Sequence, residues 1–419
     1  MSIAEDYRLR TPGSAQRAVA AARVMPGGDT RSATHHLPYP LTIARAHGTH
    51  VVDVDGNDYI DLSSNFTSLV HGNAYPPVIE AIQAAAARGT AWSARCDQHI
   101  ALAEELVGRY DCVSSMRFTN SGTEANMLAV AVARAATGRD LVLMARHGYH
   151  GSYDDLEVGF LGHEGPRTLL ADFNDLTSFE KVLANRGDEI ACVILEPVMG
   201  SAGIVEPVEG FLPGVAAAAK AAGSVFILDE VICLRHAAGG ASSVFGVRPD
   251  LTTFGKIIGG GLAVGAVGGD DSLMDLLDPA RGLMYHSGTF NGNPMTAAAG
   301  LAALRELTPE RIVAIGALAA QLRDGLLDRG RELGLSFSVR RSESLLNAYF
   351  SASPPPPGLK REDTEFMSAF HVAALNHGLF FPSRGMMVTS TVMTPRLIDE
   401  VIERAGAAMN DVVAELGAR

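Results

Sequence analysis

Cysteine is scarce in this sequence, and its cysteines form no metal-binding pattern. There are four, widely separated and without a CxxC pair: Cys96, Cys112, Cys192 and Cys233. Cysteine-based zinc sites need closely spaced thiols, and disulfide-rich secreted domains carry many more cysteines in a shorter chain. We therefore expect small buried thiols in a reduced compartment, and we predict no metal site.

Positive charge and long apolar stretches are also lacking. The net charge is −13 and the isoelectric point lies near 5.4, which argues against nucleic acid or an anionic membrane as a partner. No apolar stretch approaches the roughly 20 residues of a membrane-spanning helix. The first residues carry acidic side chains and lack the apolar core of a secretory signal. We expect a cytoplasmic protein with no nucleic-acid or membrane partner.

What the sequence does have is a regular alternation between about residues 76 and 300. Alanine-rich helical segments alternate there with short apolar runs: MRFTN, DLVLMA, ACVILEP, VFILDEV and LTTFGK. Apolar runs separated by helices are typical of a mostly parallel sheet in an α/β domain. Ligands of such sheets bind at the carboxyl ends of the strands, so the polar residues that end these runs are the candidates for chemistry.

The flanking regions differ from this pattern. A helix is predicted over residues 14–25, followed by strands with a hairpin turn at Asp55-Gly56-Asn57. After residue 300, a long helix (309–334), a strand pair near 344–352 and 386–392, and closing helices indicate a smaller α+β domain. We predict three regions: an N-terminal segment (1–50) that packs with the small domain, a large domain (51–300) and a C-terminal small domain (301–419).

The first chemical candidate is the junction Ser121-Gly122-Thr123, where the run MRFTN meets a strong helix. A glycine lets the backbone approach a ligand, and the free N–H groups of a helix N-terminus attract an anion. Ser121 also precedes Glu124 by three residues, the spacing of a capping box. A cap and a phosphate site use the same free N–H groups, so both interpretations stay open.

Two further runs end in carboxylates. VFILDEV ends in Asp229 and ACVILEP in Glu196. A carboxylate at the end of a core strand needs a cation or strong donors as partners. A protonated pyridine nitrogen would serve, and so would a helix cap or a salt bridge.

Lys256 stands among apolar residues and glycines at the end of LTTFGK. Desolvation lowers the pKa of such a lysine, which suits a nucleophile that attacks a carbonyl group. A P-loop is excluded because Ile257 follows where serine or threonine is needed, and a dinucleotide fingerprint is excluded because Val264 replaces its last glycine. The alternative is a structural lysine that reaches solvent.

Two more residues stand at the ends of predicted elements. Thr289 lies in a glycine-bounded turn before the predicted helix start at Asn293-Pro294, and it could contact an anion. Tyr149 follows the run DLVLMA, where an aromatic ring could stack on a planar ligand or simply pack in the core.

Taken together and in this order, SGTEAN, YHG, LEP, DEV, FGK-IGGG and GTFNGNP resemble the class III aminotransferases of fold-type I. The resemblance extends from VMPGG to the last strand. It implies a fold-type I transferase and pyridoxal 5′-phosphate (PLP) as cofactor.

The resemblance also implies a role for each matching residue. Ser121, Gly122 and Thr123 would hold the cofactor phosphate, and Lys256 would bond to the cofactor and move the proton. Tyr149 and Val231 would stack on the two faces of the cofactor ring, and Asp229 would pair with the ring N–H. Glu196 would lie near the polar edge of the ring. Thr289 would contact the cofactor phosphate of a neighbouring subunit. The last role implies a homodimer with shared active sites.

The N-terminal part narrows the expected substrate. PGGDTRSATHHLPYPLTIARAHG resembles glutamate-1-semialdehyde aminomutases and, more closely, bacterial β-amino-acid (β-phenylalanine type) aminotransferases. In the latter, arginines at the positions of Arg31 and Arg384 accommodate the carboxylates of donor and acceptor. Aminomutases carry a glutamate in the segment of Arg384, and this chain has none there. Arg235 and Arg95 are rival carboxylate binders, and Trp92 and Tyr75 could line an apolar pocket or belong to the core.

We therefore predict an aminotransferase that moves the amino group of a β-amino acid to a 2-oxo acid such as 2-oxoglutarate. An aminomutase or epimerase of the same family is the alternative within the class. A non-catalytic PLP-binding protein is the alternative outside it, and the presence of Lys256, Asp229, Ser121 and Thr123 argues against that one.

Overall fold

The computed structural model describes residues 1–358 and 363–418, and its contacts separate two units. The large unit consists mainly of Pro76–Ile312. The small unit combines Met1–Tyr75 with Val313–Pro356 and the chain from residue 363 onward. This division differs from the predicted boundaries, since residues 51–75 belong to the small unit and the second division falls at 312/313, within helix α12 (Pro309–Glu332).

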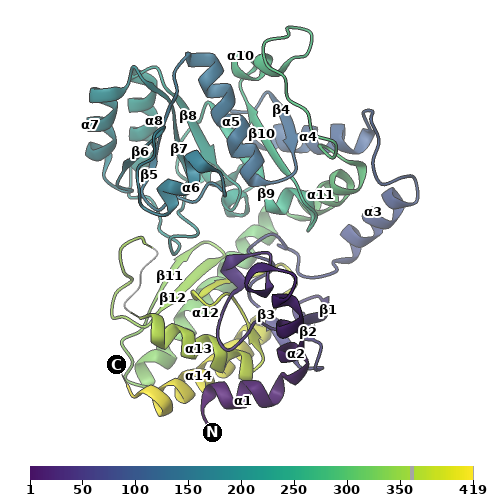
Figure 1. The fold of residues 1–419 in the computed structure, drawn as a ribbon, viewed down its shortest axis with the longest axis vertical. Helices are drawn as coiled ribbons and strands as arrows, with labels where there is room; N and C mark the ends of the chain where they lie inside the picture. Colours follow the sequence, from purple (N-terminus) through teal and green to yellow (C-terminus); the bar gives the residue numbers. More distant parts are fainter. Residues whose placement is uncertain (359–362, 419) are drawn as a thin grey trace. The chain divides into compact units, whose positions relative to one another are not determined.

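The large unit is built on a seven-stranded sheet (Figure 1). In sheet order its strands are β4 (Ser115–Thr119), β10 (Gly265–Gly269), β9 (Leu251–Gly255), β8 (Val225–Asp229), β7 (Ile190–Leu195), β5 (Leu141–Ala145) and β6 (Thr168–Ala171). β10 is antiparallel to both of its neighbours, while β9, β8, β7, β5 and β6 run parallel. The predicted α/β fold with a mostly parallel sheet is confirmed.

Apolar side chains alternate between the two faces of this sheet, and helices cover both. Cys192 and Ile194 of β7 pack in the cluster that contains helix α5 (Gly122–Thr137). Val193 and Leu195 pack on the other face with α7 (Leu176–Arg186) and α8 (Phe211–Ala221). Because both faces are buried, the strands are continuously apolar, which is why these runs could be found in the sequence.

The remaining elements of the large unit are shorter helices and 3₁₀ turns. They are α3 (Pro76–Ala86), α4 (Asp97–Arg109), α6 (Asp154–Phe160), α9 (Gly240–Val244), α10 (Asp271–Met274), α11 (Pro294–Glu306), η3 (Cys233–His236), η4 (Lys256–Gly259) and η5 (Asp275–Leu277). Helix α11 begins as predicted, because the side chain of Asn293 accepts a hydrogen bond from the Thr296 amide and Pro294 occupies the first turn.

The small unit contains two sheets. One has the order β1 (Ile43–His47), β2 (His50–Asp53), β3 (Asp58–Asp61) and β13 (Leu379–Phe380), and the other β11 (Ser338–Ser342), β12 (Leu345–Tyr349) and β14 (Met386–Val388). Its helices are α1 (Ile3–Arg10), α2 (Pro12–Ala22), α13 (Thr364–Asn376) and α14 (Pro395–Leu416), with η1 (Pro26–Gly28), η2 (Ser32–Thr34) and most of α12. β13 pairs in parallel with β3, so the first and last parts of the chain share one sheet and one core.

Four strands were not predicted from the sequence: β6, β10, β11 and the two-residue strand β13. β10 reads GAVGG, and glycine carries no side chain from which an apolar pattern could be seen. The predicted hairpin is present, with Gly56 at φ 89° between β2 and β3. Within the described part of the chain, no helix is long and apolar enough to cross a membrane.

Helix α11 lies unusually close to η4, the turn that begins with Lys256. A Cβ atom on Gly300 of α11 would stand 1.9 Å from the carbonyl oxygen of Ile258. Glycine at this point therefore allows the helix to support the backbone next to Lys256.

We expect Gly300→Ala to lower the free energy of unfolding by roughly 1–3 kcal/mol, because either the helix or η4 must move. The matched control is Gly108→Ala in α4, where an added Cβ meets nothing within 4 Å. That change should leave stability unchanged or raise it by about 0.5–1 kcal/mol. Urea unfolding of the cofactor-free proteins measures both, and equal stability of the two variants would contradict the close approach.

Candidate active site

The polar residues selected from the sequence gather at one edge of the large sheet. β4, β5, β7, β8 and β9 point the same way and end at Thr119, Ala145, Leu195, Asp229 and Gly255. The segments that follow them carry Ser121-Gly122-Thr123, Tyr149, Glu196, Val231 and Lys256. The placement at the carboxyl ends of the strands agrees with the usual ligand-binding edge of such sheets.

Ser121 caps helix α5, as its spacing to Glu124 predicted. Its Oγ accepts a hydrogen bond from the Glu124 amide at 3.1 Å. The carboxylate of Glu124 accepts from the Asn120 amide at 2.8 Å instead of completing the capping box. The amides of Gly122 and Thr123 are the first two of the helix, which have no partner inside a helix and can bind an anion.

Asp229 is a buried carboxylate held by three donors. Its Oδ2 accepts from Nδ2 of Asn126 at 2.7 Å and contacts Nδ1 of His150 at 2.8 Å, while its Oδ1 accepts from the Val231 amide at 3.1 Å. Thr253 orients this arrangement, because its hydroxyl donates to Oδ1 of Asn126 at 2.6 Å. The carboxylate is fixed at the end of β8 and can accept a further donor.

Glu196 is fixed by two backbone amides. Oε1 accepts from the Tyr149 amide and Oε2 from the Gly200 amide, each at 2.9 Å. Burial raises the pKa of Glu196 to about 7 from its usual 4.5, and the nearby Asp229 charge adds to the rise. The ring of Tyr149 itself packs edge-on against Phe160, with 5.0 Å between the ring centres.

Lys256 follows β9 with its backbone at φ 49°, a conformation that residues other than glycine rarely adopt. Burial lowers the pKa of its ammonium group, and the charges of Asp229 and Glu196 oppose that shift. Among residues 1–358 and 363–418, no carboxylate lies within salt-bridge distance of its nitrogen. A buried lysine with a lowered pKa supplies the neutral amine that attacks a carbonyl group.

Gly122 and Gly255, the residue before Lys256, pack closely against the side chain of Val231. A Cβ on Gly122 would lie 3.0 Å from Val231, and one on Gly255 would lie 3.2 Å from the same side chain. Nε2 of His150 is buried without a hydrogen-bond partner among the described residues. The phosphate of PLP needs free amides, its pyridine nitrogen needs a carboxylate and its aldehyde needs an amine with a lowered pKa. The residues present supply all three and fit this cofactor.

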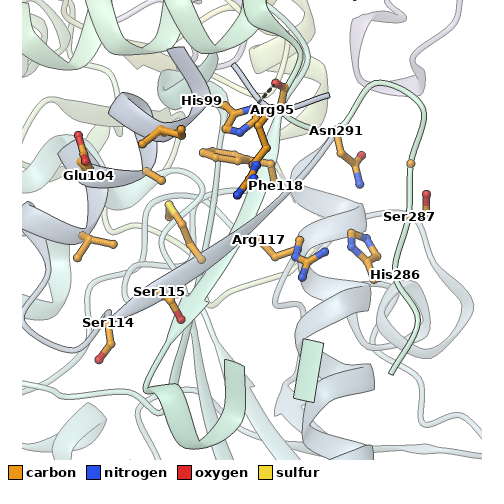
Figure 2. A pocket seen from close by; sticks show the side chains of 16 residues that line it. Arg95, His99, Glu104, Ser114, Ser115, Arg117, Phe118, His286, Ser287 and Asn291 are labelled. Carbon is orange, nitrogen blue, oxygen red and sulfur yellow. Dashed lines mark hydrogen bonds between the residues drawn. The ribbon is translucent and has the colours of Figure 1, made fainter. Parts of the chain in front are cut away.

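Thr289 is exposed, on the segment between η5 and α11. The same segment contributes to a cavity of about 720 Å³ at the β4 edge of the sheet (Figure 2). Side chains from α4, β4 and this segment line the cavity, among them His99, Arg117, Phe118 and His286. Lys256 and Asp229 do not line it, so this cavity is separate from the cofactor-type site.

The two arginines chosen as substrate binders, Arg31 and Arg384, lie in the small unit. Arg384 is the third residue of a β-turn, in which the Gly385 amide donates to the Pro382 carbonyl at 2.9 Å. Its own carbonyl accepts from Nδ2 of Asn347 at 3.2 Å. Gly385 has φ 84° and a Cβ there would clash with the Ala348 carbonyl, so the PSRG turn needs its glycine.

Arg31 is exposed and is held by the segment that follows β3. Nη1 donates to Oδ1 of Asn65 at 3.0 Å, and the guanidinium carbon stands 5.6 Å from the centre of the Phe66 ring. The ends of the Arg384 segment are tied to the same stretch, because Leu62 donates to the Phe380 carbonyl and accepts from the Val388 amide, each at 2.8 Å. Both arginines thus depend on one end of the β3–β13 pair.

That stretch contains an unusual turn. Ser64, Asn65, Phe66 and Thr67 have φ values of 45°, 47°, 52° and 77°, four consecutive left-handed residues without a glycine. The left-handed conformation costs roughly 1–2 kcal/mol for each L-residue. Strain of this kind persists only where the surrounding structure enforces it, and it gathers at functional sites.

The other candidates fall outside this arrangement. Arg235 is completely buried in η3, where burial lowers its pKa to about 10. Arg95 is exposed at the rim of the cavity in Figure 2. Trp92 is exposed, and Tyr75 stacks on His71 with 4.8 Å between ring centres.

Sequence reasoning missed the residues that hold Asp229 in place. Asn126 lies four residues after Gly122, on the face of α5 that meets the sheet, and a buried asparagine inside a helix was the available signal. His150 was part of the YHG motif, but only its tyrosine was given a role. The four left-handed residues left no trace in the sequence, since none is a glycine.

Comparisons with known proteins agree with this geometry. The sequence model of the family described as Aminotransferase class-III matches residues 31–156 and 163–413. Among curated proteins, the glutamate-1-semialdehyde 2,1-aminomutase of Anaeromyxobacter dehalogenans (strain 2CP-C) is 40% identical over 387 residues, which is 88% of this chain and 90% of that protein.

Solved structures show the same fold. An omega-transaminase from Sphaerobacter thermophilus superposes with a TM-score of 0.92 at 36% identity, over 97% of this chain and 99% of its own. A β-phenylalanine aminotransferase from Variovorax paradoxus superposes with a TM-score of 0.90 at 33% identity, over 99% of this chain and 97% of its own. A transaminase solved with PLP bound gives 0.92 at 34% identity, over 97% and 99%.

The raised pKa of Glu196 predicts a pH dependence of stability. The unfolded carboxyl group loses its proton near pH 4.5 and the folded one near 7. The protonated Glu196 therefore contributes to the free energy of unfolding in full below about pH 4.5. This contribution is lost as the pH rises through about 7, at up to about 1.4 kcal/mol per pH unit. Glu196→Gln should flatten this decline. Urea unfolding of the cofactor-free proteins between pH 5 and 8 measures it, and an unchanged slope in the variant would contradict the assignment.

Proposed function

Since this chain belongs to the class-III aminotransferases and is PLP-dependent, we propose that it transfers the amino group of a β-amino acid, such as β-phenylalanine, to a 2-oxo acid, such as 2-oxoglutarate. The observation that carries this proposal is the pair of arginines anchored at one end of the β3–β13 pair, Arg31 and Arg384. A transaminase must bind two carboxylic acids in turn, and a guanidinium group binds a carboxylate through two parallel hydrogen bonds.

In the proposed enzyme, the residues of the large unit hold the cofactor. The amides of Gly122 and Thr123 and the hydroxyl groups of Ser121 and Thr123 bind the phosphate. Asp229 would accept a hydrogen bond from the protonated ring nitrogen. Tyr149 and Val231 are assigned to the two faces of the cofactor ring, and Glu196 is assigned to its polar edge. When bound, PLP supplies an electron sink for the carbon that carries the amino group.

Lys256 performs the proton transfer. Its Nζ would hold the cofactor until the amino donor binds. The neutral amine, which its lowered pKa favours, then removes the proton from the substrate carbon that carries nitrogen. Arg31 and Arg384 orient the carboxylates of donor and acceptor during these steps. The net reaction exchanges the amino group of one acid for the oxo group of the other.

The second candidate is a glutamate-1-semialdehyde 2,1-aminomutase, and the comparison with curated sequences favours it. The relative from Anaeromyxobacter dehalogenans, 40% identical, bears that name. What supports the transaminase instead is Arg384 itself. Aminomutases carry a glutamate in this segment, and this chain has none there. The two candidates differ in whether an added 2-oxo acid is required.

We expect β-phenylalanine alone to convert the bound cofactor to its pyridoxamine form, and 2-oxoglutarate to restore it. The visible absorption of the holoenzyme follows both half-reactions. Arg384→Gln should raise the KM for 2-oxoglutarate about tenfold or more, because the acceptor loses a bidentate charged partner, and should leave the first half-reaction largely intact.

The aminomutase predicts a different result. It would leave the spectrum unchanged with β-phenylalanine and would convert glutamate 1-semialdehyde to 5-aminolevulinate without any 2-oxo acid. Turnover of the semialdehyde in this manner would reject the transaminase proposal in favour of the second candidate.

We further propose a homodimer, with Thr289 contacting the cofactor phosphate of the neighbouring subunit. Large apolar side chains are exposed on the segment that carries Thr289: Leu283, Tyr285 and Phe290. Tyr285 is 94% exposed, which is unusual for an aromatic side chain outside an interface. This segment also lines the cavity at the β4 edge, which a second copy would cover.

Tyr285→Asp should therefore weaken the dimer at least about tenfold, because a buried aromatic anchor is replaced by a charge. The matched control is Val208→Asp, another exposed apolar residue of the large unit, placed just before α8. Sedimentation velocity over a concentration series measures both. A wild-type protein that stays monomeric, or two variants with equal effects, would contradict this interface.

A further inference from the structure

Hydrogen bonds to the buried carboxylate of Asp61 hold the left-handed turn Ser64–Thr67 in place. Asp61, at the end of β3, accepts hydrogen bonds from the amides of Ser63 and Ser64, each at 2.9 Å. Its second oxygen accepts from Nδ2 of Asn73 at 2.9 Å. Asp61 is buried, so the carboxylate that holds the turn is itself fixed in position.

Within this turn, the side chain of Asn65 has a defined orientation. The hydroxyl of Ser68 donates to the backbone carbonyl of Asn65 at 2.9 Å. The Oγ atom of Ser68 can then only accept from Nδ2 of Asn65, at 3.1 Å. The amide oxygen, Oδ1, therefore faces the other way, where it accepts from Nη1 of Arg31 at 3.0 Å. Ser68 thereby decides which end of the amide meets the guanidinium group.

Asn65 holds Arg31 without neutralising it. Among residues 1–358 and 363–418, this is the single hydrogen bond of the Arg31 guanidinium group. The charge of Asp29 acts on Arg31 from nearby, but its carboxylate accepts from the Arg31 backbone amide and forms no ion pair with the guanidinium group. The neighbouring Phe66 ring lies 5.6 Å from the guanidinium carbon and restricts it further. An oriented cation with most of its donors unused is suited to a planar, bidentate anion.

We propose that Asn65 is a positioning residue that sets the specificity of this enzyme for carboxylate-bearing substrates. It acts through Arg31, and the left-handed turn exists to bring a neutral acceptor to that guanidinium group. Asparagine suits the position because it is among the residues that best tolerate the left-handed conformation. Aspartate would tolerate it as well, but its charge would occupy Arg31 in place of the substrate. This inference rests on the proposed function, in which Arg31 binds the carboxylate of the amino donor.

The test uses the holoenzyme and two ligands that differ in charge. 3-Phenylpropanoate is β-phenylalanine without its amino group, and 3-phenylpropan-1-ol is the uncharged counterpart. Isothermal titration calorimetry gives the dissociation constant of each. The variants are Asn65→Asp, which keeps the shape and adds a charge, and Asn65→Gly, which keeps the backbone conformation and removes the amide.

We expect Asn65→Asp to weaken 3-phenylpropanoate binding about tenfold or more and Asn65→Gly about threefold, with less than about twofold change for the alcohol. In turnover, the loss should fall on the KM for β-phenylalanine and spare kcat. The control is Asn174→Gly, at another left-handed asparagine (φ 70°) located in the large unit, and it should change neither constant.

A double-mutant cycle separates positioning from a general structural effect. If Asn65 acts through Arg31, Asn65→Asp should have no further effect on 3-phenylpropanoate binding in an Arg31→Gln background. Additive losses, or equal losses for the acid and the alcohol, would overturn the positioning role while leaving the proposed function intact. A wild-type holoenzyme that does not bind 3-phenylpropanoate would reject the proposed donor class, and this inference with it.

Discussion

The buried carboxylate of Asp229 is the constraint on which the site in the large unit depends. A charge at the end of a fully buried strand is costly unless donors compensate it. Here Asn126, His150 and the Val231 amide do so, and Thr253 on the neighbouring strand orients Asn126. The network ties α5, the segment after β5 and strands β8 and β9 into one rigid arrangement.

The same arrangement determines the chemistry of Lys256. The ammonium group is desolvated at the end of β9, while the fixed charges of Asp229 and Glu196 keep its pKa from falling further. An amine with a lowered pKa and a carboxylate that can still accept a hydrogen bond from a protonated ring nitrogen are two features that a PLP enzyme needs from its protein. The chain provides them on adjacent strands, so their spacing is set by the sheet itself.

Much of this could be predicted from the sequence, for reasons that the structure explains. β5, β7, β8 and β9 are buried on both faces, so they read as apolar runs and their terminal polar residues stood out. The partners of Asp229 could not be predicted in the same way, because Asn126 lies inside a helix and the contact depends on how α5 packs on the sheet. The turn at Ser64–Thr67 was not predicted, because its residues are of ordinary types and none is a glycine. Local hydrogen bonds to Asp61, which Asn73 holds in turn, support its conformation. The β2–β3 hairpin was recognised but assigned to the large domain, because its pairing with β13 joins residues more than 300 positions apart.

We expect PLP to bond to Lys256, and the composition of the chain allows a direct test. There are only four lysines in the sequence: Lys181, Lys220, Lys256 and Lys360. Borohydride reduction of the holoenzyme makes the bond permanent, and mass spectrometry of the digested protein then locates the added phosphopyridoxyl group. We expect the modification on the peptide that contains Lys256 and on no other lysine peptide. A label on another lysine, or a reduced holoenzyme without any label, would contradict it.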